Sequence, residues 1–320
     1  MQSITRFVLI GGSAVIAAGC SETRSSSTVP LEPPVREISR DVPWPTHGVV
    51  FAAGNELRFV TEGSTLPELF YSIDGAAIVF PGWSPDGTRM AFSMTAAGSN
   101  DPWTIHVLDR AGTLQRLSTG GVYDIAPSWS PDGSRIAFVS RSVPDGNDEV
   151  YVMNADGRNR VRITNGGMRS RPGFPAWSPD GTRIAYTWTD GSSVNPHTGI
   201  YVVKPDGTDA ERLTQATTPI AFGQRPAWSP DGRRLAFLTD DQRRIGFLDV
   251  EGKLDLGRIS LPTLAANLAW SPDGKSIAFN DQCAEDEAEC AGTFIWLIQT
   301  ADGSLVRMPS LYGYSPAWIR

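Results

Sequence analysis

The sequence contains few of the residues on which most catalytic and metal sites depend. Of its 320 residues, only three are histidine and three are cysteine. The histidines, His47, His106 and His197, have no second histidine or cysteine at the spacing that metal sites use. The motifs GxSxG, HExxH and GxGxxG and the Walker loop do not occur after residue 20. The sequence therefore does not indicate a hydrolase, a zinc enzyme or a nucleotide-binding enzyme of a common type.

The sequence also has no excess of positive charge. It contains 28 lysine and arginine residues against 35 aspartate and glutamate residues, which gives a formal net charge of −7 at pH 7. Proteins that bind the phosphate backbone of nucleic acids need clustered lysine and arginine, and the sequence shows no basic cluster. We therefore expect no nucleic-acid partner.

One nearly uncharged, apolar stretch stands near the N-terminus, over residues 7–18, directly after Arg6. About twelve residues are too few for a helix that spans the ~30 Å apolar core of a bilayer, so the stretch is typical of a signal peptide. It ends in Ala-Ala-Gly-Cys at residues 17–20, which resembles the bacterial lipobox. In that pattern the signal is cut before the cysteine and the thiol is acylated. An ordinary cleavage site followed by a chance cysteine is the alternative.

We therefore expect residues 1–19 to be a lipoprotein signal peptide and Cys20 to be lipidated. Residues 20–46 are polar and rich in proline, without a helical or strand period, and are expected to form a flexible tether. A coil of ~25 residues spans about 25–30 Å, enough to hold a domain clear of a membrane. The expected location is the periplasmic side of the outer membrane in a Gram-negative cell, and the cell surface otherwise.

The dominant feature of the remaining sequence is a repeat. The string Trp-Ser-Pro-Asp-Gly occurs five times, beginning at Trp83, Trp129, Trp177, Trp228 and Trp270. A sixth element, Pro-Ala-Trp at residues 316–318, repeats only the opening of the unit. Successive tryptophans of this series are 42 to 51 residues apart. A repeat of this length is typical of propellers and other arrays of similar units.

Each repeat predicts four short antiparallel strands. In Ser-Pro-Asp-Gly, proline sets φ at the second position, aspartate tolerates the third, and glycine accepts the left-handed conformation at the fourth. This predicts a tight turn between the tryptophan strand and the strand after it. In the second repeat, a third strand is expected at residues 149–153, a second turn at 154–157 and a fourth strand that ends at 162–164. Four such strands make one propeller blade.

The unit xPxWSPDGxxIAF, followed by IYVM, DG and RLT, resembles the repeat of TolB-type β-propellers and covers residues 47–320. The resemblance implies an all-β propeller domain at residues 47–320. It also implies a TolB-like, non-catalytic scaffold of the cell envelope that binds other proteins. The expected partner is an envelope protein or a peptidoglycan-associated partner. We expect the membrane to be contacted only through the lipid anchor, and the propeller to be a monomer.

The two ends of this region predict how the ring closes. The strand expected at residues 48–52 has no tryptophan strand before it, and Trp318 has no following strand of the Ile-Ala-Phe type. Joined together, the two halves complete one mixed blade and remove the exposed strand edges of an open ring. With the five complete repeats, this predicts six blades.

The pattern of turns predicts where a partner binds. The Ser-Pro-Asp-Gly turns share one face of the propeller and are uniformly tight, whereas the connections on the opposite face vary in length and composition, as binding surfaces do. The candidate residues precede the tryptophan strands near the central mouth of that face: Asp124, Arg171, Gln224, Arg225, Asn267 and Tyr314. For each of them, an ordinary solvated loop residue is the alternative. The alternative function is an enzyme that processes a glycan or a small molecule at this mouth.

Two acidic segments contain oxygen ligands that suit a calcium ion, residues 145–148 and 281–289. Neither follows the twelve-residue loop pattern that sets calcium geometry. We therefore interpret them as solvated loops, with a calcium site as the alternative. No cofactor and no other metal are expected.

Cys283 and Cys290 lie close together in one connection of the last complete repeat. Because exported proteins reach oxidising compartments, in which nearby cysteines pair, we expect a disulfide bond between them. Two free thiols are the alternative.

The lipobox pattern yields a direct test. In a Gram-negative host, we expect the N-terminal peptide of the mature protein to begin at Cys20 and to carry the mass of attached acyl chains. The variant Cys20→Ser should be released from membranes or remain uncleaved, because it lacks the thiol that is acylated. Mass spectrometry of the N-terminal peptide is the measurement, and a peptide without lipid mass would contradict the prediction.

Overall fold

The computed structural model describes residues 44–45, 47–61, 64, 66–98, 100–118, 123–141, 147–166, 171–189, 198–215, 218–221, 223–282, 293–308 and 313–319. All of them belong to one compact unit, residues 33–320. The expected signal peptide, Cys20, Cys283 and Cys290 lie outside the described residues. Within the described ranges every regular element is a β-strand, and no helix there could cross a membrane.

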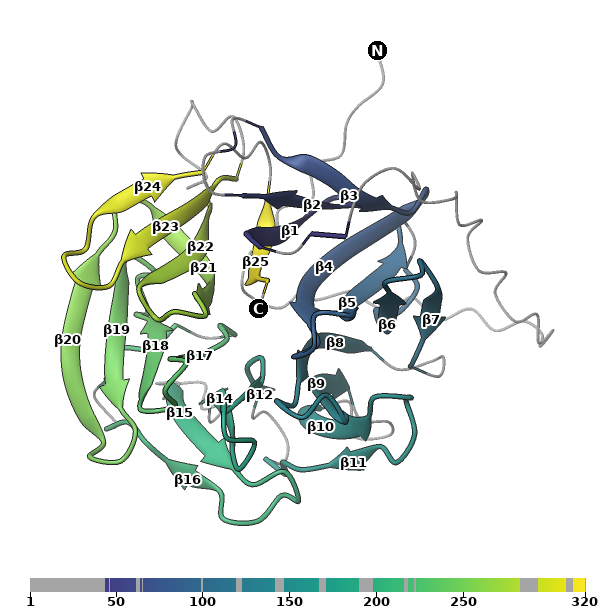
Figure 1. Cartoon of the computed structure of the whole chain (residues 1–320). Coiled ribbons are helices and arrows are strands. Elements are labelled where there is room, and N and C mark those ends of the chain that lie inside the picture. The colour runs from purple at the N-terminus through teal and green to yellow at the C-terminus, as the bar shows by residue number, and fades with distance from the viewer. Residues whose placement is uncertain are drawn as a thin grey trace. The chain divides into compact units, whose positions relative to one another are not determined.

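The described strands form six sheets around a common centre (Figure 1). We number them blades 1 to 6. Blade 1 comprises β4 (Ala76–Trp83), β5 (Arg89–Ala96), β6 (Thr104–Asp109) and β7 (Leu114–Arg116). Blade 2 comprises β8 (Asp124–Trp129), β9 (Arg135–Arg141), β10 (Asp148–Asn154) and β11 (Val161–Arg162). Blade 3 comprises β12 (Arg171–Pro172), β13 (Ala176–Trp177), β14 (Ile184–Thr189), β15 (Thr198–Val203) and β16 (Glu211–Arg212).

The other three blades follow the same order from the centre outwards. Blade 4 comprises β17 (Ala227–Trp228), β18 (Arg234–Leu238), β19 (Arg244–Asp249) and β20 (Leu254–Ser260). Blade 5 comprises β21 (Leu264–Trp270), β22 (Ser276–Gln282), β23 (Ile295–Gln299) and β24 (Leu305–Arg307). Blade 6 comprises β25 (Tyr314–Trp318), β1 (Val49–Ala53), β2 (Glu56–Val60) and β3 (Glu68–Ser72). The prediction of an all-β, six-bladed propeller is confirmed.

Blade 6 is the mixed blade that the sequence predicts. Its inner strand β25 comes from the C-terminal side of the chain, and its other three strands come from the N-terminal side. β25 pairs antiparallel with β1, with Val49 opposite Trp318 and Val50 opposite Ala317. The amide of Ile319 also donates to the Gly48 carbonyl at 3.0 Å. The propeller therefore closes by hydrogen bonding between segments from both ends of the described chain.

The turn after each inner strand is held by its own side chains. In blade 1, Ser84 Oγ donates to Asp86 Oδ1 at 2.6 Å, and the Thr88 amide donates to the same carboxylate oxygen at 3.1 Å. Gly87 takes a φ of 65°, which other residues rarely adopt. In blade 2, the hydrogen bond from Ser130 and those from Ser134 hold the pKa of Asp132 at about 2. These aspartates are turn-forming residues, as the sequence indicates.

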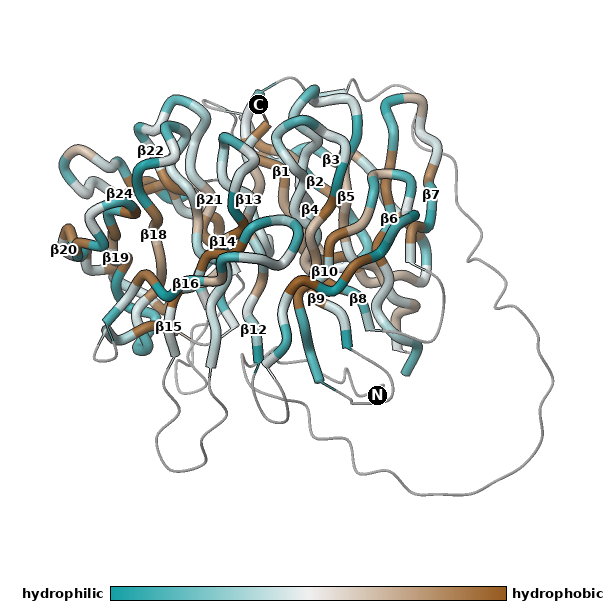
Figure 2. The backbone as a smooth tube through the Cα atoms, turned by 90° about the horizontal axis from the view of Figure 1, so that it is seen from below, coloured by the Kyte–Doolittle hydropathy of each residue, from teal (hydrophilic) through white to brown (hydrophobic). Residues whose placement is uncertain are grey.

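Neighbouring blades meet at the repeat tryptophans. The arginine just after each of four turns places its guanidinium over the tryptophan of the next blade, and such contacts are attractive because the ring face is electronegative. The distances from Cζ to the ring centroid are 4.6 Å for Arg89 and Trp129, 4.9 Å for Arg135 and Trp177, 5.6 Å for Arg183 and Trp228, and 5.3 Å for Arg234 and Trp270. Figure 2 shows apolar residues along the strands and more hydrophilic ones at many of the turns.

The seam between blades 6 and 1 has a tryptophan in place of this arginine. The ring of Trp44 lies 5.2 Å from that of Trp83 and 4.9 Å from that of Phe70, edge-on to both. Its Nε1 donates to the Gly87 carbonyl at 2.7 Å. Trp44 falls within the expected tether of residues 20–46, and it packs against the propeller. The packed domain includes it because the sixth blade has no Ser-Pro-Asp-Gly arginine to cover Trp83.

Closure through blade 6 predicts the effect of removing its inner strand. Deletion of residues 315–320 should lower the free energy of unfolding by about 3 kcal/mol or more, because a packed tryptophan and most of β25 are lost. The control Trp318→Phe keeps an aromatic ring and loses the hydrogen bond from Nε1 to the Ala269 carbonyl, 2.9 Å long, so it should cost about 1 kcal/mol. Urea denaturation measures both. An unchanged midpoint for the truncated protein would contradict the mixed blade.

Candidate functional site

In four of the six blades, the inner strand is kinked three residues before its tryptophan. Four of the six residues at this position are non-glycine residues with positive φ: 55° at Phe80, 58° at Ala126, 56° at Asn267 and 53° at Ser315. In the same four blades, the pairing of the inner strand with its neighbour shifts register around the kink, as in a β-bulge. Positive φ at such residues costs ~1–3 kcal/mol and persists where the surroundings fix it, often at functional sites.

We call the six residues at this position the axial ring: Phe80, Ala126, Phe174, Arg225, Asn267 and Ser315. Two contacts cross the centre of the propeller between them or their neighbours. The rings of Phe80 in blade 1 and Phe174 in blade 3 lie 4.5 Å apart, edge to face. Arg225 Nη2 in blade 4 donates to the Pro127 carbonyl in blade 2 at 3.1 Å. Each contact skips one blade, which is possible only close to the axis.

The axial ring has an apolar half and a polar half. Phe80, Ala126 and Phe174 belong to one apolar cluster with Ile125 and Val139. The other half carries a guanidinium, an amide and a hydroxyl, on Arg225, Asn267 and Ser315. A ligand at the axis would therefore meet aromatic surface on one side and hydrogen-bonding groups on the other.

Side chains from the preceding blade hydrogen-bond the inner strands at or next to this position. Ser93 Oγ accepts from the Ala126 amide at 3.0 Å, and Thr187 Oγ1 donates to the Gln224 carbonyl at 3.1 Å. Asn280 Oδ1 accepts from the Ser315 amide at 3.2 Å. Each of these residues directly follows the aromatic residue of the second strand. They are not among the candidates that the sequence indicates, although a small polar residue after Ile-Ala-Phe or its equivalent is a visible signal.

The polar half is also linked between blades. Gln224 Oε1 accepts from the Asn267 amide at 3.2 Å, and Asn267 Nδ2 donates to Asn280 Oδ1 at 2.9 Å. Gln224 and Asn280 are 8% and 1% exposed. The structure therefore brings the predicted residues Gln224, Arg225 and Asn267 together near the axis, and it adds Asn280 to them.

Arg225 is the charged residue of the axial ring. Apart from the bond to Pro127, it makes no hydrogen bond or ion pair with the described residues, and its Nε is buried without a partner. Burial lowers the pKa of Arg225 to about 10, because desolvation disfavours the charged form. The guanidinium still carries its charge at neutral pH.

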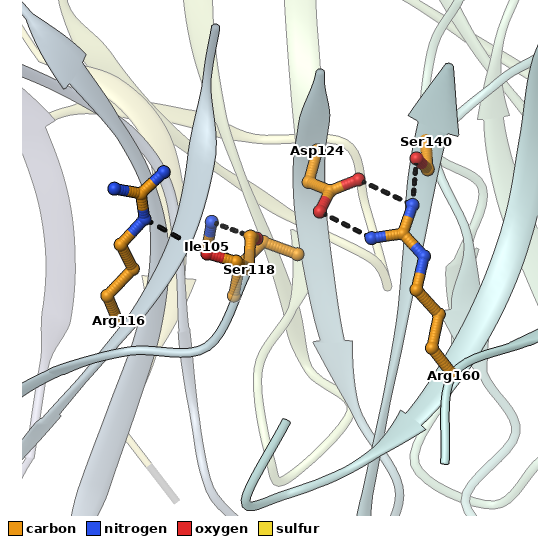
Figure 3. A network of polar contacts seen from close by, with 6 residues as sticks. All are labelled: Ile105, Arg116, Ser118, Asp124, Ser140 and Arg160. Carbon is orange, nitrogen blue, oxygen red and sulfur yellow. Dashed lines mark hydrogen bonds and ion pairs between the residues drawn. The ribbon is translucent and has the colours of Figure 1, made fainter. Parts of the chain in front are cut away.

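Asp124 differs from its predicted role on the binding face, because it is fully buried. Its two carboxylate oxygens accept from Arg160 Nη1 and Nη2 at 2.7 and 2.9 Å (Figure 3). Arg160 also donates to Ser140 Oγ and lies over the rings of Phe138 and Tyr151, at 5.0 and 4.7 Å. Asp124 is therefore a structural partner of Arg160 within blade 2, and its carboxylate is not available to a ligand in this arrangement.

The other two predicted residues are exposed. Tyr314 stands next to the axial residue Ser315 and has 39% of its surface exposed. Arg171 is exposed at the start of β12. Together they place one aromatic and one charged side chain on strands that lead into the axial ring.

The residues considered for metal binding have other surroundings. His106 is buried in β6, stacks on Phe92 at 6.2 Å, and has a pKa lowered to about 4 by burial. Asp281 accepts from the Phe294 amide and from Trp296 Nε1 at 2.6 and 2.9 Å. His197, residues 145–146 and residues 283–289 lie outside the described residues. Within the described part of the chain, no group of three or more histidine, cysteine, aspartate or glutamate residues could hold a metal ion.

A family model described as the TolB beta propeller domain matches residues 68–173. Among solved structures, TolB from Acinetobacter baumannii has a TM-score of 0.67 and 21% identity, over 85% of this chain and 66% of that one. The chain has a TolB-like β-propeller fold. It spans just under two thirds of the length of that TolB.

Other propellers share the architecture of this TolB-like fold. A propeller in a nidogen/laminin complex matches with a TM-score of 0.65 and 14% identity, over 85% of this chain and 98% of that one. An oligogalacturonate lyase from Vibrio parahaemolyticus matches with a TM-score of 0.53 and 14% identity, over 71% and 69% of the two chains. A comparison with curated protein sequences finds no match. At these identities, the structural matches establish the fold and leave the function to the site.

The burial of Asp124 in this TolB-like propeller predicts a structural phenotype. Asp124→Asn should lower the free energy of unfolding by about 3 kcal/mol, because it leaves the Arg160 charge unpaired. The matched control is Asp148→Asn, since Asp148 pairs with Arg141 at 2.9 Å and the Arg141 side chain is 52% exposed. Loss of that pair should cost less than ~1 kcal/mol. Equal costs in urea denaturation would show that the buried pair has no special weight.

Proposed function

We propose that the protein is an exported envelope lipoprotein whose propeller is a non-catalytic scaffold and binds a partner protein around the mouth of the axial ring. The observation that carries this proposal is the position of Tyr314. A partly exposed aromatic residue beside the axis, next to mixed polar groups, has the composition of an interface anchor. The expected partner is an envelope protein or a peptidoglycan-associated partner.

The difference between the two faces of the propeller supports this location. In the five complete repeats, the link between the first and second strands has five or six residues, and its aspartate is engaged in the turn in each blade. Links between the second and third strands, on the opposite face, range from five residues in blade 4 to twelve in blade 5. Variable loops on a regular scaffold commonly carry recognition. The face with the variable links is therefore the better binding surface.

The anchor of this scaffold is proposed from the N-terminal sequence. Residues 17–20 have the lipobox pattern, and a polar, proline-rich segment follows them. Lipidation at Cys20 would hold the propeller at the periplasmic side of the outer membrane in a Gram-negative cell, or at the cell surface otherwise. The segment between Cys20 and Trp44 would give it reach, because proline-rich coils are extended.

The placement of the binding face has a direct test. Tyr314→Ala should weaken capture of the partner about tenfold with the fold intact, because anchors near an interface centre cost ~1–2 kcal/mol or more when truncated. The partner is first identified by crosslinking the anchored protein in its native envelope, and its affinity is then measured with purified proteins. The control Thr88→Ala lies in a turn on the opposite face and should lower stability while leaving affinity unchanged. The opposite pattern would place the site on the wrong face.

A further inference from the structure

Among the residues that the structure describes, no acidic group pairs with the guanidinium of Arg225. Its Nε is buried without a partner, and its one hydrogen bond, from Nη2, goes to the neutral Pro127 carbonyl. Among the described residues no carboxylate pairs with it. Its pKa falls but stays well above neutrality. Removing a charge from water costs several kcal/mol unless an opposite charge compensates it.

Other buried charges of the same propeller are compensated. The carboxylate of Asp124 accepts hydrogen bonds from both Nη1 and Nη2 of Arg160. Glu149, 1% exposed, accepts from the Gly166 amide at 2.9 Å and from Thr164, and lies 3.4 Å from an Arg162 nitrogen. The buried carboxylates of blade 2 therefore have positively charged partners, whereas Arg225 at the axis has no carboxylate partner among the described residues. Sites that break a local rule in this way are commonly functional.

We propose that the axial ring binds a carboxylate of a partner peptide, with Arg225 as its cation. The inference rests on the proposed function and adds the chemistry that the scaffold recognises. A guanidinium presents parallel N–H groups that match the two oxygens of one carboxylate. Arg225 as a whole is partly exposed to solvent, and binding requires an acid to approach its guanidinium from the mouth.

The rest of the axial ring favours a carboxylate over a phosphate. Arg225 is its one cation, and the backbone amides of Asn267 and Ser315 already donate to Gln224 and Asn280. A phosphate dianion would therefore meet one positive charge and few free donors. The Phe80 and Phe174 rings form an apolar wall in the same ring. An acidic group next to an apolar side chain, as in a peptide, suits both parts.

Two matched pairs of probes test this proposal on the full-length protein, purified from the envelope in detergent. N-acetylphenylalanine and its amide test a chain-end carboxylate. N-acetyl-Phe-Asp-amide and N-acetyl-Phe-Asn-amide test a side-chain carboxylate. Saturation-transfer NMR titration gives the dissociation constants, and at least one acid should bind about tenfold or more tightly than its neutral partner, the usual weight of a charged hydrogen bond. Equal binding within both pairs would overturn the proposal, as would tighter binding of inorganic phosphate.

Substitutions at Arg225 separate recognition from a structural role. Arg225→Gln should abolish the preference for acid over amide. Arg225→Lys should keep part of it, because lysine retains the positive charge but lacks the parallel N–H groups of a guanidinium. The control Arg233→Gln removes an exposed arginine on the opposite face and should leave the preference unchanged. If Arg225→Gln does not fold, the wild-type protein and Arg225→Lys still decide the question. A folded Arg225→Gln that keeps the full preference would show that Arg225 is not the cation.

This result is independent of the test for the binding face. Loss of partner capture in Tyr314→Ala with no preference for acids leaves the scaffold standing and removes the axial carboxylate site. A preference for acids with capture that depends on Thr88 instead of Tyr314 leaves the axial site and contradicts the proposed interface.

Discussion

The contacts between neighbouring blades are centred on the tryptophan that ends each inner strand. The indole nitrogens of Trp129, Trp228 and Trp318 donate to carbonyls one residue before the tryptophan of the preceding blade, at 3.1, 3.0 and 2.9 Å. In blades 1, 3 and 5 the corresponding nitrogen, on Trp83, Trp177 or Trp270, is buried without a partner.

The contacts between neighbouring blades determine which residues meet at the centre of the propeller. The inner strands of all six blades lie nearest the centre, and contacts across it join residues at or near the position three before the tryptophan. Phe80, at the kink of blade 1, contacts Phe174 of blade 3 across the centre. Polar side chains from the preceding blade, such as Ser93 and Asn280, hold the kinked backbone. The same contacts between neighbouring blades therefore stabilise the fold and position the residues of the candidate site.

Asp124 and Arg225 differ in whether an oppositely charged side chain pairs with them, and this difference separates the structural residue from the candidate binding residue. Asp124 and Arg225 are near neighbours of repeat tryptophans in the sequence, and a sequence-based interpretation assigns both to the binding face. In the fold, Asp124 forms a bidentate ion pair with Arg160, whereas Arg225 of blade 4 donates to the Pro127 carbonyl of blade 2. Arg225 is half-buried and has no acidic partner among the described residues, which lowers stability, and such a cost is typical of binding sites.

The sequence alone determined the six blades, the mixed blade and the turn-forming aspartates, because these depend on local signals repeated at a near-constant interval. Ser-Pro-Asp-Gly specifies its turn wherever it occurs, and a tryptophan strand without its partner predicts where the ring closes. The tertiary structure alone decided which distant residues contact one another, both at the axis and within and between blades. Trp44 covers Trp83, Arg160 neutralises Asp124, and Arg225 reaches Pro127. These contacts join residues 36 to 98 positions apart, and such pairs follow from the spacing and rotation of the blades, which no local pattern encodes.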